Sequence, residues 1–380
     1  MTTSRTEPAS AREQMAADAR VDTRPRRNAR ATFHPLTVAE IQPLTEDSAA
    51  ITFNVPDELR EAFSFHAGQS VTLRRTIDGI DHRRTYSICA PTGAQPHVGV
   101  REIPQGLFSS WLVHDLKVGD TVEVQTPTGA FQAEPATAGR HLCIAAGSGI
   151  TPMLSIASSV LANPASKVTL LYGNRTTRSV MFSEELADLK NRHGARLDLI
   201  HVLSREPRDV ELFSGRLDAD RLRRLLPLLV PLQALDHVWI CGPFGLVADA
   251  REVLAELHVP QSKVHVELFY VDEPPPELSR QETPIDADSS SMVTVVLDGR
   301  ASTTPMAKNR TILDSATLTR SDLPFACKGG VCGTCRAQVT SGQVDMRRNY
   351  ALDEDEVSRD YVLTCQTYPV GDTVTVDFDS

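Results

Sequence analysis

Four cysteines near the C-terminus constrain the fold of this chain more than any other feature. They are Cys327, Cys332, Cys335 and Cys365. The pattern C-x4-C-x2-C with a later fourth cysteine is the spacing that holds a plant-type [2Fe–2S] cluster on four thiolates. Gly329, Gly330 and Gly333 lie inside the loop, where they allow tight turns and let backbone N–H groups approach the sulfurs. A zinc site or a disulfide pair is the alternative, but zinc usually takes pairs of the form C-x2-C.

Composition and charge agree with a soluble redox protein. The chain has 380 residues, enough for two or three domains, and its 41% apolar content is ordinary. No apolar run is long enough to cross a bilayer, and residues 1–31 lack the apolar core of a secretory signal, so they predict a disordered leader. Reduced thiols beside an iron–sulfur cluster indicate the cytoplasm. The net charge of −10 disfavours nucleic acid as a partner.

Residues 272–290 are rich in proline, acids and serine, which predicts a linker. The segment that follows, residues 291–380, carries the four cysteines. Short β-branched or alternating runs at residues 292–297 and 374–378 predict strands, and a helix is expected at residues 311–318. This size and order predict a β-grasp ferredoxin domain.

Two further domains are expected before the linker. In residues 32–138, short strand-like runs separated by Gly and Pro predict an antiparallel β-barrel. These runs are residues 49–55, 70–74, 84–88, 98–103 and 121–125. In residues 139–271, apolar strands alternate with helical patterns such as residues 244–257, which predicts a doubly wound parallel α/β sheet. The strands expected there are residues 141–146, 167–172, 196–203, 237–241 and 263–268.

A glycine-rich turn follows the first strand of the predicted α/β domain. Gly147 and Gly149 would let the backbone approach a pyrophosphate, and Thr151 opens a helix whose N-terminus favours phosphate. A purely structural turn is the alternative. The turn at Cys241 and Gly242 ends a later parallel strand, so the two turns are expected to face one crevice.

Two motifs in the predicted barrel suit a flavin. In Arg84-Thr85-Tyr86-Ser87, a phenol and a hydroxyl can flank an isoalloxazine ring while the arginine neutralises phosphate, although this short match alone is common by chance. Gly106 and Ser109 then form a Gly-x-x-Ser step before a helix, which is the geometry of a phosphate cradle.

Basic and hydroxyl residues after two successive strands favour NADPH over NADH. Arg175 follows the strand at residues 167–172, and Ser204 and Arg205 follow the next strand. In dinucleotide folds an acid near a strand end holds the ribose 2′-OH of NAD, whereas arginine accommodates a 2′-phosphate. Solvated surface arginines are the alternative.

Taken in order, these motifs resemble those of the ferredoxin–NADP reductase superfamily, with a plant-type ferredoxin fused at the C-terminus. The combination is similar to the reductase components of bacterial multicomponent oxygenases, and among them most to the reductase subunits of phenylacetyl-coenzyme A epoxidases. Residues 84–91, 172–175, 204–206 and 215–217 carry this last likeness. The resemblance covers about residues 32–380.

The resemblance implies FAD, NADPH and a [2Fe–2S] cluster as cofactors, with FMN as an alternative flavin. The residues it implies for cofactor binding in the barrel are Arg84, Tyr86, Ser87, Val100, Arg101, Gly106, Phe108 and Ser109. Those it implies for the nicotinamide nucleotide are Gly147, Gly149, Thr151, Arg175, Ser204, Arg205, Cys241 and Gly242. Tyr86, Ser87 and Cys241 would lie at the reacting centre, and Phe269 near the flavin edge.

The implied function is electron transfer from NADPH through FAD and the cluster to a di-iron oxygenase, with phenylacetyl-coenzyme A as the substrate of that partner. Three alternatives stay open. The chain could serve another ring or steroid oxygenase, act as a general reductase with many clients, or be a non-catalytic redox sensor. The nucleotide turns are complete, which disfavours the sensor.

Overall fold

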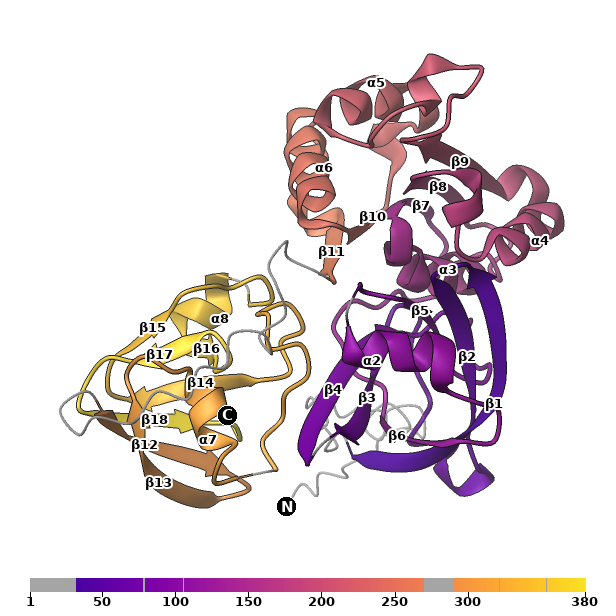
Figure 1. Ribbon diagram of the computed structural model, residues 1–380. Helices are drawn as coiled ribbons and strands as arrows, with labels where there is room; N and C mark the ends of the chain where they lie inside the picture. The colour runs from indigo at the N-terminus through magenta and orange to yellow at the C-terminus, as the bar shows by residue number, and fades with distance from the viewer. Residues whose placement is uncertain (1–31, 78, 105, 270–289, 321, 353) are drawn as a thin grey trace, which may run out of the picture. The chain divides into compact units, whose positions relative to one another are not determined.

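Figure 1 shows the computed structural model of the chain, which describes residues 32–77, 79–104, 106–269, 290–320, 322–352 and 354–380. The expected leader at residues 1–31 lies outside the described residues, as does the expected linker up to residue 289. No helix among the described residues is both long enough and apolar enough to cross a membrane. The compact unit of the chain runs from Phe33 to Ser380.

The first part of this unit is an antiparallel β-barrel, as the sequence predicts. Its strands follow the order β4-β3-β6-β1-β2-β5. They are β1 (Phe33–Thr45), β2 (Ser48–Asn54), β3 (Ser70–Ile77), β4 (Ile80–Ser87), β5 (His97–Arg101) and β6 (Thr121–Gln125). An isolated bridge between Ile88 and Val98 joins the outer strands β4 and β5 just beyond the end of β4, and so closes the sheet. Helix α2 (Leu107–Ser110) and a π-helical turn (Trp111–Asp115) cover its core with Phe108 and Leu112.

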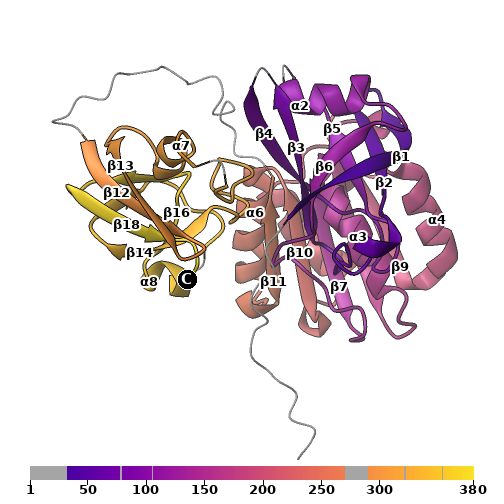
Figure 2. The ribbon, with the colours of Figure 1, turned by 90° about the horizontal axis from the view of Figure 1, so that it is seen from below.

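The second part is a parallel sheet with the strand order β11-β10-β7-β8-β9. Its strands are β7 (Arg140–Ala146), β8 (Lys167–Asn174), β9 (Leu197–Leu203), β10 (His237–Gly242) and β11 (Val264–Leu268). Its helices are α3 (Ile150–Val160), α4 (Ser183–His193), α5 (Ala219–Leu229) and α6 (Phe244–Glu256). Alternate strand residues face two separate cores, one shared with α3 and α4 and the other with α5 and α6. Figure 2 shows α4 and α6 on opposite sides of this sheet. The sheet is therefore doubly wound, as predicted.

The strand order places a topological switch point between β7 and β10. The chain moves from β7 to β8 and β9 on one side, and returns to β10 and β11 on the other. In open α/β sheets ligands bind at the carboxyl ends of the strands at such a point. Here those ends carry the turn that begins at Gly147 and the turn that follows Cys241 and Gly242 at the end of β10.

The third part is a mixed five-stranded sheet with the order β13-β12-β18-β14-β16 and a small second sheet, β15-β17. The strands are β12 (Ser290–Leu297), β13 (Arg300–Ala307), β14 (Arg336–Ser341), β15 (Val344–Met346), β16 (Tyr361–Leu363), β17 (Thr367–Pro369) and β18 (Thr373–Asp377). Helix α7 (Ile312–Ala316) packs on this core, and α8 (Glu354–Ser358) precedes β16. The Thr311 hydroxyl caps α7 by accepting a 3.2 Å hydrogen bond from Asp314 N. The cysteine loop lies between α7 and β14.

Candidate active site and cluster centre

The aromatic pair of the predicted flavin site comes together in the structure. Tyr86 at the end of β4 and Phe108 in α2 stack with ring centroids 6.5 Å apart. Phe108 is buried, and burial raises the pKa of Tyr86, so its phenol stays protonated. Arg84 on the same strand donates from Nη1 to Arg83 O at 2.8 Å, which fixes the direction of its guanidinium. A flat aromatic face beside a phenol and a cation suits a flavin ring and its phosphate.

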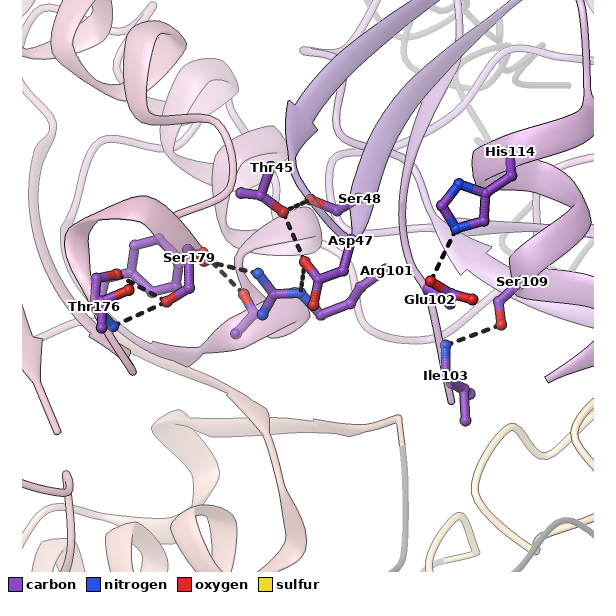
Figure 3. Close-up of polar contacts among 12 residues, drawn as sticks. Thr45, Asp47, Ser48, Arg101, Glu102, Ile103, Ser109, His114, Thr176 and Ser179 are labelled. Atoms are coloured by element: carbon purple, nitrogen blue, oxygen red, sulfur yellow. Dashed lines mark hydrogen bonds and ion pairs between the residues drawn. The ribbon is translucent and has the colours of Figure 1, made fainter. Parts of the chain in front are cut away.

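The Gly106 turn is closed by its own hydrogen bonds. Gly106 N donates to Ile103 O at 2.8 Å, and Ile103 N donates to the Ser109 hydroxyl at 3.0 Å (Figure 3). A Cβ at Gly106 would lie only 2.8 Å from Ser109 Oγ, so a side chain there would press on this hydroxyl. The Ser109 hydroxyl therefore builds the turn, and a phosphate held here would meet mainly backbone N–H groups.

A hydroxyl, a carboxyl group and a thiol meet where the barrel joins the parallel sheet. Ser87 Oγ donates to Glu267 Oε2 at 3.0 Å, although the two residues are 180 positions apart. Cys241 on β10 is the register partner of Glu267 on β11. Cys241 is fully buried and Ser87 nearly so. Ser87 and Cys241 were predicted site residues, whereas the sequence prediction did not give Glu267 a role.

The electrostatics of this group favour its neutral forms. Burial raises the pKa of Glu267 to about 8, and the hydrogen bond from Ser87 only partly opposes this shift. Burial and the neighbouring Glu267 raise the pKa of the Cys241 thiol. Near neutral pH the centre thus holds a protonated carboxyl group and a protonated thiol.

The two predicted nucleotide turns lie against each other, as expected. Gly147 has φ +55°, a conformation that favours glycine, and its carbonyl accepts a 2.9 Å hydrogen bond from the Tyr172 hydroxyl. A Cβ at Gly149 would collide with the Cys241 carbonyl oxygen, so only glycine lets the turns approach this closely. The Thr151 hydroxyl donates to Ser148 O at 3.0 Å and closes the turn from within. The helix α3 that follows offers its N-terminus at the switch point.

Arg101 spans the barrel and the parallel sheet domain. Its guanidinium lies 3.3 Å from Asp47 Oδ1 and donates to Ser179 O at 2.7 Å (Figure 3). A Cβ on Gly147 would be 3.3 Å from Arg101 Nη1, so the cation also borders the glycine turn. Val100, the preceding predicted residue, has its side chain buried in the barrel core and can offer a ligand only its backbone.

The structure brings together the basic residues predicted to select the nucleotide. Ser204 N donates to Asn174 O at 2.9 Å, and Arg205 N donates to Arg175 O at 2.8 Å. Arg175 and Arg205 are exposed, and neither side chain has an ion-pair partner within the described ranges. The Asn174 side chain is buried, and its amide atoms lack a hydrogen-bond partner among the described residues. The sequence analysis included Asn174 in a motif but assigned it no role.

Phe269 follows β11 directly and packs, partly buried, against the core that contains Cys241 and Tyr172. This places it beside the strand end that carries Cys241, and its position near a flavin edge stays a prediction. The aromatic that follows it, Tyr270, lies outside the described residues.

The four predicted cluster ligands interact with one another, and the largest effects lie within two pairs. A hydrogen bond between Cys327 and Cys332 lowers the pKa of the first thiol and raises that of the second, and interaction with Cys365 raises the pKa of Cys335. Across the described part of the chain, no three or more His, Cys, Asp or Glu side chains form a site for a single metal ion. Two pairs of thiols suit two irons, each bound by two sulfurs, better than one zinc ion.

The loop backbone is shaped for this arrangement. Lys328, Gly330 and Gly333 have φ values of +52°, +79° and +69°, which fold the loop tightly. Gly329 N donates to Cys327 Sγ at 3.3 Å, the N–H to sulfur contact that the sequence predicted. The Thr364 hydroxyl donates to Cys335 O at 2.9 Å and joins the loop to the segment that carries Cys365. The residues present therefore fit a [2Fe–2S] cluster.

Comparison with known domain families agrees with this division. Residues 35–133 match the oxidoreductase FAD-binding domain, residues 143–252 the oxidoreductase NAD-binding domain, and residues 295–370 the 2Fe-2S iron-sulfur cluster binding domain. The chain thus carries FAD-, NAD- and 2Fe-2S-binding domains in that order. Fold and sites together define an iron–sulfur flavoprotein oxidoreductase that uses a nicotinamide nucleotide.

Comparison with known relatives shows which kind of oxidoreductase this chain resembles. The chain is 42% identical to one subunit of the 1,2-phenylacetyl-CoA epoxidase of Escherichia coli (strain K12), covering 92% of this chain and 98% of the relative. It is 33% identical to the ferredoxin reductase component of 3-ketosteroid-9-alpha-monooxygenase from Rhodococcus rhodochrous, covering 90% and 96%. The solved structure of phthalate dioxygenase reductase shares the fold, with a TM-score of 0.59 and 23% identity over 91% of this chain and 98% of that one. The chain belongs to the family of oxygenase reductase components, and its activity is electron transfer.

Proposed function

We propose that this protein is the NADPH-dependent reductase of a multicomponent oxygenase and that its partner is a di-iron enzyme that converts phenylacetyl-coenzyme A to its ring 1,2-epoxide. The observation that supports this proposal most is the 42% identity to the 1,2-phenylacetyl-CoA epoxidase polypeptide of Escherichia coli, over 98% of that relative. The redox centres suit the task, because oxygenases take single electrons whereas nicotinamide nucleotides give two at once.

A bound FAD would supply the chemistry that turns a hydride from the nicotinamide into single electrons for the cluster. In our proposal Arg84, Tyr86 and Ser87 hold the flavin, with Phe108 stacked behind Tyr86. Two facts favour this placement: the 6.5 Å stack of the two rings, and the hydrogen bond that brings Ser87 to the end of the parallel sheet. We favour FAD over FMN because residues 35–133 match the FAD-binding family.

Gly147, Gly149 and Thr151 would bind the nucleotide pyrophosphate, and Cys241 and Gly242 would border its nicotinamide end. The contact between Gly149 and the Cys241 carbonyl supports this assignment, because it brings the two turns to one point. Glu267 would act beside them as a neutral carboxyl group. Its raised pKa lets it donate a hydrogen bond near neutral pH, and the Ser87 hydroxyl orients it.

NADPH rather than NADH is proposed from Arg175, Ser204 and Arg205. Their backbones are hydrogen-bonded across two strand ends, and both arginine side chains are exposed. Exposed guanidinium groups beside a hydroxyl suit the 2′-phosphate that distinguishes NADPH. The cytoplasm is the proposed location, because an iron–sulfur cluster and unpaired thiols need a reducing compartment. The proposed domain limits are those expected from the sequence: residues 32–138, 139–271 and 291–380.

Reconstitution tests the proposal. The purified chain, the oxygenase subunits of the phenylacetyl-CoA epoxidase and NADPH are combined, and epoxide formation from phenylacetyl-coenzyme A is followed by mass spectrometry. Product should form only when all components are present. Reduction of ferricyanide by NADPH without any product would show a working reductase with a different client. Turnover by the reductase alone would contradict the division of labour.

A steroid oxygenase is the second candidate, because the 3-ketosteroid-9-alpha-monooxygenase reductase component is 33% identical over 90% of this chain. The same assay with steroid oxygenase components distinguishes the two. Faster coupled turnover with the steroid system would favour this second candidate.

A further inference from the structure

The turn after β8 is fastened from several sides. Thr176 and Ser179 form a reciprocal capping box around a 3-10 helix, η4 (Thr177–Ser179), in which Thr176 N donates to Ser179 Oγ at 3.0 Å. Arg101 reaches this turn from the barrel and donates to Ser179 O at 2.7 Å (Figure 3). Asp47 and the Thr45 hydroxyl bonded to it hold the arginine from behind. The position of Thr177 is therefore well defined.

Thr177 uses both of its donors on one carboxylate. Its backbone N–H donates to Glu206 Oε2 and its hydroxyl donates to Glu206 Oε1, each at 2.7 Å. These bonds lower the pKa of Glu206, so the carboxylate remains charged at neutral pH. Each carboxylate oxygen of Glu206 thus has a donor from Thr177.

Glu206 follows β9 and lies beside the segment after β8, the second strand, where an acid normally affects the choice of nucleotide. It directly follows Arg205, which is hydrogen-bonded through its backbone to Arg175. A free carboxylate at this edge of a dinucleotide fold accepts hydrogen bonds from the ribose hydroxyls of NAD and repels a 2′-phosphate. The pattern Ser-Arg-Glu thus places a favourable arginine and an unfavourable acid side by side.

We propose that Thr177 is a specificity-determining positioning residue: it binds both carboxylate oxygens of Glu206 and so keeps this acid from the nucleotide 2′ position, leaving that position to Arg205. The inference rests on the proposed binding of the NADPH 2′-phosphate by Arg205. It assigns Glu206 no contact with NADPH in the native protein. A Glu206 released from Thr177 turns toward the nucleotide, where it disfavours NADPH and favours NADH.

Two substitutions release Glu206 in steps. Thr177→Val removes the hydroxyl bond and keeps the β-branched shape. Thr177→Pro removes both donors, and proline is tolerated here because Thr177 is the first residue of η4 and Thr176 is extended, with φ −141° and ψ 167°. The measured quantity is kcat/KM for NADPH divided by kcat/KM for NADH, with ferricyanide as acceptor. We expect this ratio to fall about twofold in Thr177→Val and about five- to tenfold in Thr177→Pro, because a like charge would then face the phosphate.

A second substitution tests whether the released Glu206 carboxylate causes the change in the ratio. Adding Glu206→Gln to Thr177→Pro removes the released charge and should return the ratio to the native value or above it. Glu211→Gln, an exposed acid in the same loop, is the matched charge control and should not restore the ratio. A ratio unchanged in Thr177→Pro, or one that Glu206→Gln fails to restore, would overturn the inference. A native protein that prefers NADH would instead refute the proposed NADPH preference, which the native ratio reports separately.

Discussion

The Ser87 hydroxyl donates a 3.0 Å hydrogen bond to Glu267 Oε2, joining the end of a barrel strand to the edge strand of the parallel sheet. Glu267 is in turn the register neighbour of Cys241. The centre is therefore assembled from both domains, and its protonation depends on how tightly they pack. Burial keeps the Glu267 carboxyl group neutral until the pH reaches about 8.

The first prediction concerns pH. If the neutral carboxyl group of Glu267 supports the reaction, the rate of flavin reduction by NADPH should fall as the pH rises through about 8. Glu267→Gln keeps a neutral hydrogen-bonding side chain, so its rate should be lower but flat across that range. Stopped-flow measurements of flavin bleaching between about pH 6 and 10 check this. The same falling limb in Glu267→Gln would assign the titration to another group.

A second prediction arises from three neighbouring imidazoles at the amino ends of β7, β10 and β11. His237 stacks on His141 with centroids 5.1 Å apart, and its Nδ1 lies 3.3 Å from His265 Nε2. Trp239 donates to His141 Nδ1 at 3.2 Å and stacks on His265. Burial lowers the pKa of each imidazole, that of His141 to about 4, while Asp236 partly opposes the shift for His141 and His237.

The folded state thus binds fewer protons here than the unfolded state between pH 6.5 and about 4. The stabilising contribution is complete above pH 6.5 and is lost as the pH falls, by about 3 kcal/mol for His141. Urea unfolding followed by tryptophan fluorescence should show that the free energy of unfolding falls as the pH is lowered through this range. His237→Gln should make the slope with pH shallower, whereas His66→Gln, at an exposed site, should not. Equal slopes in all three proteins would contradict the assignment.

A third prediction concerns the cluster ligands. Replacing any one of Cys327, Cys332, Cys335 and Cys365 by serine should remove the visible absorption of the cluster, while NADPH still reduces the flavin. Cys89→Ser, at a buried thiol outside the cysteine loop, is the matched control and should keep that absorption. Absorption spectra with iron and sulfide analysis decide the matter. Loss of the cluster in the single variant Cys89→Ser would show that the ligands were wrongly assigned.

Arg205 carries the fourth prediction. Its guanidinium should pair with the 2′-phosphate, so Arg205→Ala should raise the KM for NADPH about tenfold or more and change the KM for NADH little. Steady-state kinetics with ferricyanide measure both values. Arg178→Ala, at another exposed arginine of the same region, serves as the control. If Arg205→Ala changed the KM for NADPH and the KM for NADH equally, Arg205 would be a solvated surface residue with no part in nucleotide selection.

Local sequence signals predicted much of this structure. The cysteine loop and the glycine turns were found because their function requires fixed spacing and short-range backbone geometry. β1 was missed, since Pro35 and Pro43 argue against a central strand. The structure accommodates β1 between β2 and β6 with register shifts near Val38 and Pro43, and most of its side chains are not buried.

The contacts that complete the candidate active site could not be predicted from local sequence patterns. Ser87 and Glu267 are separated by 180 positions, and no periodic pattern in either strand indicates that they meet. Glu206 was recognised as part of a motif, but its bonds to Thr177, 29 positions away, depend on how two strand ends align. An acid between the apolar residues Val266 and Leu268 of β11 was a signal that could have identified Glu267.

The last prediction concerns docking of the proposed oxygenase partner near the cluster loop. Four consecutive acids at residues 353–356 lie in the sequence between the cysteine loop and Cys365, and acids near a cluster can steer a basic partner surface. In the structure Asp355 in α8 is exposed, whereas Glu356 lies 2.6 Å from Arg336 Nη1 and is largely neutralised. Charge-steered association weakens as salt screens it. Electron transfer to the oxygenase should therefore slow by about three- to tenfold between about 0.05 and 0.5 M salt, while ferricyanide reduction changes much less.

Two matched variants locate the steering charge. Asp355→Asn should reduce the salt dependence of electron transfer, because it removes an exposed charge that a partner can meet. Glu356→Gln removes a charge already paired with Arg336 and should alter the salt dependence little. Stopped-flow rates of electron transfer to the oxygenase at several salt concentrations measure both. Asp355 would be excluded as a steering charge by either of two results. Salt could have no effect on electron transfer in the native protein, or Asp355→Asn and Glu356→Gln could change the salt dependence equally.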